Sequence, residues 1–222
     1  MISPVLSNLY LHEVLDLWFE HEVKPRLLGR AFEIRSDDAA LVFERKEDAR
    51  RVLAVLSKRF AKYGLRLHPE KTHLVDFRSP PRAGGGGSQR ERSFGLLGFT
   101  HYWGRSRKGR WVVQRKTAKD RFTRALREIG RWCRAHRHWP VAAQQAALHR
   151  KLKGHYAYYG ITGNGRALAC FLYEVRHLWR KWLHRRSWRG RMTWEKFGRL
   201  VARYPLPQPR VVHSIYRRAA TL

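Results

Sequence analysis

A tract rich in proline, glycine and serine divides this chain into two unlike parts. The tract, RSPPRAGGGGSQRERS at residues 78–93, offers almost no apolar side chains to a core. Such a composition predicts a flexible loop or linker. Because 222 residues suffice for one or two domains, we expect a separately packed part on each side of the tract.

The balance of charge changes at the same place. Residues 1–80 contain 14 Lys and Arg against 12 Asp and Glu, a net charge of +2, whereas residues 81–222 contain 33 against 5, a net charge of +28. A region this basic requires a polyanion as its partner, and nucleic acid is the usual one. A surface kept charged only for solubility is the alternative, but solubility needs far less charge.

Three features favour a cytoplasmic protein without a membrane partner. The two cysteines, Cys133 and Cys170, provide no disulfide framework. The first 20 residues lack the basic region and cleavage site of a signal peptide. The longest apolar runs are far too short to cross a bilayer.

The part before the tract predicts helices packed on a β-hairpin. Two short apolar runs, AFEIR and AALVF, flank a polar turn at residues 36–38, and an amphipathic helix follows at residues 46–64. The chain from 65 to 77 is expected to be extended. A helix near the N-terminus has an apolar stripe made of Leu6, Leu9, Tyr10, Val14 and Trp18.

The part after the tract predicts a strand pair and a small helix bundle. The strands pair around Lys108 and Gly109. Four amphipathic segments follow at residues 117–137, 140–154, 166–186 and 193–204, the second of which is expected to stop at Gly154. Short helices with short links are typical of a bundle, so the fold class is α+β.

The polar turn of the hairpin holds two adjacent carboxylates, Asp37 and Asp38. Hard divalent cations such as Mg²⁺ prefer oxygen ligands, and a two-metal site for phosphoryl transfer needs several carboxylates from different strands. Aspartate is also a common turn former, so the pair by itself leaves a simple turn open.

Longer motifs occur in an order that resembles the reverse transcriptase encoded by bacterial group II introns. They are ISPVLSNLYLHEVLD, RSDDAALVF, GLRLHPEKTHLVDF and FGLLGFTHYWG, followed by LKGHYAYYGITGN and YPLPQPRVVHSIY, which resemble the family's maturase region, also called the thumb or X domain. The resemblance implies the second half of a polymerase palm at 1–78, a loop at 79–93, a primer-grip-like hairpin at 94–114 and a helical thumb at 115–222.

The same resemblance implies site residues. Asp37 and Asp38 match the paired palm aspartates, which bind Mg²⁺, and Lys71 in HPEKT matches a lysine near the nucleotide phosphates, although a surface lysine is equally consistent with its position. The family's Tyr-Ala before the pair is replaced by Ser36, and the strand with the other metal-binding aspartate would precede Met1. We therefore expect a truncated copy with an incomplete Mg²⁺ site that does not polymerise by itself.

The basic part is expected to bind RNA, since forked arginine donors suit phosphates and aromatic faces suit bases. For the tyrosines, core packing is an equal alternative. The predicted RNA-binding residues are Arg105, Arg107, Lys108, Arg110, Lys116, Arg121, Arg124, Tyr156, Tyr158, Arg180, Lys181, Arg185, Arg186 and Arg189.

The resemblance also implies partners. Group II intron RNA is the first, and a DNA target is the second. A complementing N-terminal half, or self-association, would complete the half-palm. The alternative function is a basic RNA-binding or ribosome-associated module without polymerase chemistry, which would need neither the acidic pair nor the HPEKT segment.

Overall fold

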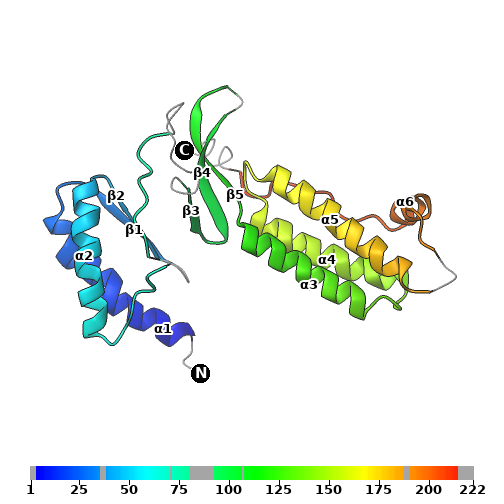
Figure 1. Cartoon of the computed structure of the whole chain (residues 1–222), viewed down its shortest axis with the longest axis horizontal. Helices are drawn as coiled ribbons and strands as arrows, with labels where there is room; N and C mark the ends of the chain where they lie inside the picture. The colour runs from blue at the N-terminus through cyan, green and yellow to red at the C-terminus, as the bar shows by residue number, and fades with distance from the viewer. Residues whose placement is uncertain are drawn as a thin grey trace. The chain divides into compact units, whose positions relative to one another are not determined.

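The computed structural model describes residues 4–35, 39–70, 72–80, 93–106, 108–187 and 191–214 (Figure 1). The chain divides into two compact units, Met1–Leu97 and Gly98–Leu222. The described residues form six α-helices and two small antiparallel sheets, so the predicted α+β class is confirmed. No helix in these ranges is both long and apolar enough to cross a membrane.

The N-terminal helical segment changes its hydrogen-bonding pattern along its length. Helix α1 (Pro4–Leu11) leads into two π-helical turns, η1 (His12–Asp16) and η2 (Phe19–Val23), and then a 3₁₀ turn, η3 (Lys24–Arg26). In a π turn an N–H donates to the carbonyl five residues earlier, as that of Leu17 does to His12 O. The wider turns rotate the residues that follow away from a 3.6-residue period.

The apolar stripe predicted on this segment is therefore wrong in its first half. Val14 and Trp18 are buried as expected, but Leu6, Leu9 and Tyr10 are exposed. The prediction extended one α-helical period through the whole segment, and the π turns begin directly after α1.

The predicted hairpin is present beside a long amphipathic helix. Strands β1 (Ala31–Arg35) and β2 (Ala39–Phe43) pair antiparallel with Ala31 opposite Phe43. Helix α2 (Lys46–Lys62) packs against them, and Ala31, Phe43, Val52 and Leu56 share one apolar cluster. The turn at residues 36–38 lies outside the described residues.

The opposite face of the hairpin is apolar and exposed. Phe32 pairs with Val42 across the strands, and Ile34 follows on the same face. All three side chains are exposed, Phe32 by 60% of its surface. An apolar face of this kind favours association with another protein surface.

A buried carboxylate fixes the loop that leads into β1. Asp48 in the first turn of α2 is almost completely buried. Its Oδ2 accepts hydrogen bonds from the backbone N–H groups of Leu28 and Gly29, both at 3.0 Å. A buried carboxylate needs such donors, so Asp48 is a structural residue of the first unit.

A second sheet of three strands has the order β3-β4-β5. They are β3 (Ser93–Leu96), β4 (Phe99–Arg105) and β5 (Trp111–Thr117). Strands β4 and β5 pair from Phe99–Thr117 to Arg105–Trp111, which confirms the hairpin predicted around Lys108 and Gly109. Gly109 has φ of +73°, a left-handed conformation that suits glycine in this turn.

Besides β4 and β5, the second unit contains four helices: α3 (Lys119–Ala135), α4 (Val141–Tyr159), α5 (Gly165–His184) and α6 (Trp194–Arg203). Helices α3, α4 and α5 lie side by side (Figure 1). Their shared core confirms the predicted bundle. It is centred on Leu148, Leu152, Phe171, Val175 and Trp179.

The predicted stop of α4 at Gly154 is wrong. The helix continues to Tyr159, and Gly160 is the residue that ends it. A Cβ at Gly154 would meet nothing within 4 Å, so no close contact requires glycine there, and the helix continues through it at a cost of roughly 1 kcal/mol relative to alanine. At Gly160 a Cβ would lie 2.2 Å from Tyr156 O, so glycine is required there.

Two buried amides hold the ends of the bundle. Gln144 Oε1 accepts from Trp179 Nε1 at 2.9 Å, and its Nε2 donates to the carbonyls of Arg137 and Trp139 in the α3–α4 loop. Asn164 accepts from the N–H of Thr117 at 3.0 Å and donates to Thr117 Oγ1 at 2.8 Å. The second amide ties the end of β5 to the start of α5.

A histidine inside the bundle predicts a pH-dependent stability. His155 stacks on Phe171 with ring centroids 3.7 Å apart, and burial lowers the pKa of His155 from 6.5 to about 4. Between these pH values the unfolded chain binds a proton that the folded chain does not. The free energy of unfolding should therefore decrease as the pH falls from about 6.5 towards about 4.

Urea unfolding of the wild type and of His155→Phe at several pH values measures this effect. Carboxylates titrate in both proteins, so the difference between the two pH dependences reports His155. Identical pH dependences in this range would contradict the assignment.

Candidate nucleic-acid interface

The second unit carries far more positive charge than its own carboxylates can pair. Residues 98–222 contain 30 Lys and Arg but only four Asp and Glu. Three of the four already lie beside an arginine of the same helix: Asp120 beside Arg121 at 3.6 Å, Glu195 beside Arg199 at 3.2 Å, and Glu128 beside Arg131. Most of the cations are therefore available to an external anion.

One group of predicted residues lies at the β4–β5 hairpin. The guanidinium of Arg105 lies 4.7 Å from the centre of the Trp111 ring and donates to Gly109 O. Lys108 and Arg110 are exposed in the turn. Lys116 is also exposed and lies 5.0 Å from the centre of the Tyr102 ring. Arg107 lies outside the described residues.

The two predicted tyrosines occupy different environments. Tyr158 is 53% exposed, and its ring stacks on Phe99 with centroids 5.9 Å apart. Tyr156 is only 2% exposed, and its hydroxyl donates to Pro207 O. Burial raises the pKa of Tyr156 to about 12. Burial thus supports core packing for Tyr156, and only Tyr158 offers a surface to a base.

The predicted residues of α3 lie near its start. Arg121 and Arg124 are exposed, and Arg121 is the partner of Asp120. Both arginines lie on the first two turns of the helix, directly after β5.

Basic residues at the end of α5 fall into two kinds. Arg180 lies 4.0 Å from the centre of the Trp194 ring and donates to Met192 O, and Arg186 donates to His138 O. Both therefore hold contacts within the protein. Lys181 and Arg185 are exposed. Arg189 lies outside the described residues.

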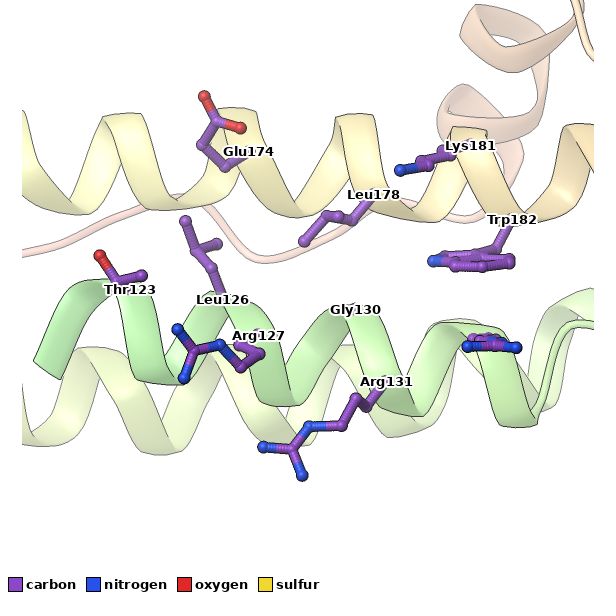
Figure 2. Close-up of a pocket in the computed structure, with 10 residues that line it drawn as sticks. Thr123, Leu126, Arg127, Gly130, Arg131, Glu174, Leu178, Lys181 and Trp182 are labelled. Carbon is purple, nitrogen blue, oxygen red and sulfur yellow. The ribbon is translucent and has the colours of Figure 1, made fainter. Parts of the chain in front are cut away.

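A groove of about 430 Å³ runs between α3 and α5 (Figure 2). Its middle is apolar, with Leu126 and Leu178 facing each other beside Gly130. Basic side chains from both helices surround it. The remaining lining residues are Thr123, Arg127, Arg131, Arg134, Glu174, Lys181 and Trp182.

Arg134 lines this groove but is not among the RNA-binding residues predicted from the sequence. Its guanidinium lies 5.9 Å from the centre of the Trp182 ring, although the two residues are far apart in the chain. The helical periodicity of residues 117–137 placed Arg134 on a polar face. The proximity of Arg134 to Trp182 arises from the packing of α3 against α5, which helical periodicity does not predict.

The residues predicted for polymerase chemistry, Asp37, Asp38 and Lys71, lie outside the described residues. Within the ranges that the structure does describe, no three His, Cys, Asp or Glu side chains gather as a metal site. Cys133 is buried in the bundle, and this burial raises the pKa of its thiol to about 12.

Residues 1–101 match the family described as reverse transcriptase (RNA-dependent DNA polymerase). Searches of curated proteins and of solved structures gave no match. The matched stretch includes the β1–β2 hairpin and α2, whereas the basic helices lie beyond it. Members of this family typically bind nucleic acid and generally use a divalent metal.

Proposed function

We propose that this chain belongs with the reverse transcriptases of group II introns and that its basic helical unit binds the intron RNA, as the maturase region of that family does. The single observation that carries the RNA-binding part is the excess of 30 basic over four acidic residues in residues 98–222. The reverse transcriptase match in residues 1–101 supports the link to RNA.

The exposed side chains of the second unit support a nucleic acid partner over other polyanions. Cations alternate with aromatic rings at the β4–β5 hairpin, where Arg105 lies on Trp111 and Lys116 on Tyr102. Tyr158 presents a further half-exposed ring. Phosphates require the cations, and unstacked bases use the rings. A surface for a polyanion without bases would need only the cations.

For the first unit we propose the role of a polymerase palm segment. The sequence RSDDAALVF, which covers the turn and β2 of the hairpin, resembles the part of a palm that presents paired aspartates. Asp37 and Asp38 would then supply carboxylate oxygens to Mg²⁺, and Lys71 would contact nucleotide phosphate. Electron paramagnetic resonance of bound Mn²⁺ tests the metal role. The Asp37→Asn/Asp38→Asn variant should bind less Mn²⁺ than the wild type, and equal binding would contradict it.

The choice between an intron-specific protein and a general basic RNA-binding module can be tested with the full chain. Fluorescence anisotropy should be measured with a folded group II intron domain and with an unrelated structured RNA of the same length, at the same salt concentration. We expect at least about tenfold tighter binding to the intron RNA, since non-specific charge contacts alone would give equal affinities. Equal affinities would favour the general module.

A further inference from the structure

The groove between α3 and α5 has two chemically different ends (Figure 2). Helix α4 returns between α3 and α5, so these two helices run in the same direction. Thr123 and Glu174 line the end near their N-terminal halves, and Trp182 lines the other end. Glu174 precedes Lys181 by two helical turns, which corresponds to about 10 Å. The end with Glu174 also holds Arg127 and so carries both signs of charge, whereas the charged lining residues at the Trp182 end are all basic.

Three cations surround the indole at the basic end. The charged groups of Arg185, Lys181 and Arg134 lie 5.3, 5.8 and 5.9 Å from the centre of the Trp182 ring. Within the described ranges none of the three pairs with a carboxylate. Arg131, which lines the same groove, differs because it pairs with Glu128.

This arrangement leaves positive charge uncompensated. Like charges in one small region repel each other. A cation–π interaction with an aromatic face stabilises an exposed cation by only roughly 0.5–1 kcal/mol. A phosphate between the cations would remove the repulsion and accept the forked donors of the arginines. Glu174 would repel the same phosphate at the other end. The charges therefore favour a phosphate at the Trp182 end of the groove.

We propose that Arg134, Lys181 and Arg185 together bind one or two adjacent backbone phosphates of the RNA, with Trp182 as the surface that arranges them. This site rests on the RNA-binding function proposed above and assigns it a specific anchor. A competing explanation for the presence of these three cations is a structural one. Cations near the C-termini of α3 and α5 are also stabilised by the helix dipoles.

The test compares two variants of the full chain that each lose three positive charges. One is R134Q/K181Q/R185Q. The matched control is R30Q/R78Q/R199Q, whose exposed arginines lie beside Glu44 at 4.0 Å, Asp76 at 2.6 Å and Glu195 at 3.2 Å. Fluorescence anisotropy with the folded intron RNA gives the affinity of each protein over a series of salt concentrations. Thermal unfolding of each protein is measured in parallel.

For R134Q/K181Q/R185Q we expect the slope of log affinity against log salt to fall in magnitude by about 1 to 2, because one or two phosphates are no longer neutralised. The affinity should fall about tenfold or more at a salt concentration of roughly 100 mM. The control should keep a nearly wild-type slope. R134K/R185K, which retains both charges, should keep it too.

Equal slopes for the two triple variants would overturn the site. A lowered melting temperature with a wild-type slope would also overturn it and would assign the three cations to stabilisation of the helix ends. Absence of RNA binding by the wild-type chain is a different result, and it would refute the proposed RNA-binding function itself.

Discussion

The affinity of the full chain for structured RNA should fall on the order of a thousandfold when the salt concentration is raised from about 50 to about 200 mM. Each phosphate that a lysine or arginine neutralises releases a counterion, and contacts to roughly six to ten phosphates give a fall of this size. The exposed cations at the β4–β5 hairpin, in α3 and at the end of α5 are numerous enough for such a contact set.

A titration at four or more salt concentrations measures this dependence. Tyr158→Ala provides a contrast within the same surface, since it removes an exposed ring and no charge. We expect that variant to bind more weakly with the wild-type slope. A wild-type affinity that changes less than about tenfold over the same salt range would contradict charge-driven binding.

Trp179→Ala should unfold most or all of the second unit. Trp179 is fully buried at the centre of the bundle core, and its Nε1 donates to Gln144 Oε1 at 2.9 Å. Removing a buried tryptophan costs about 3–5 kcal/mol, and the orphaned Gln144 oxygen adds about 1–3 kcal/mol. The sum approaches the whole stability of a typical domain, about 5–15 kcal/mol.

Chemical denaturation followed by circular dichroism measures this loss. Trp111→Ala is the matched control, because Trp111 lies at the exposed start of β5 and its removal should cost less than about 1 kcal/mol. Trp179→Phe should fall between the two, since it refills part of the volume but leaves Gln144 without its donor. Equal stability of Trp179→Ala and Trp111→Ala would contradict the assigned core.

Amphipathic periodicity predicted the helices of the second unit well because their packing follows it. Helices α3 and α5 occupy nearly the expected ranges, and Thr193 caps α6 by accepting from the N–H of Lys196. The failures have local causes. The π turns after α1 change the period, and α4 continues through Gly154 although glycine usually favours a helix end.

The polar residues that hold the fold together left no signal in the sequence. Asp48, Gln144 and Asn164 are each nearly fully buried, yet each is a polar residue in a segment that also carries exposed polar residues. Their partners are backbone groups or a side chain distant in sequence. Such pairings depend on how the helices and strands pack together, and the hydrophobic periodicity of the sequence does not predict this packing.

The candidate binding surface could be proposed from the sequence in kind but not in detail. Charge and aromatic content indicated the second unit, and Lys181 and Arg185, which lie near Trp182, are among the predicted RNA-binding residues. The sequence could not separate them from Arg180, which is held by Trp194 and Met192 O. It also could not bring Arg134 to the same ring, because that proximity arises from the packing of α3 on α5.

Lysine acetylation of the free and RNA-bound chain, read by mass spectrometry, tests most directly whether the basic helical unit is the RNA-binding surface. Lys108, Lys116 and Lys181 of the second unit and Lys58 and Lys62 of α2 are all exposed in the free protein, so all five should react. With folded intron RNA bound, the first three should be protected while Lys58 and Lys62 keep their reactivity. Protection of Lys58 and Lys62 with continued reactivity at Lys108, Lys116 and Lys181 would contradict the account.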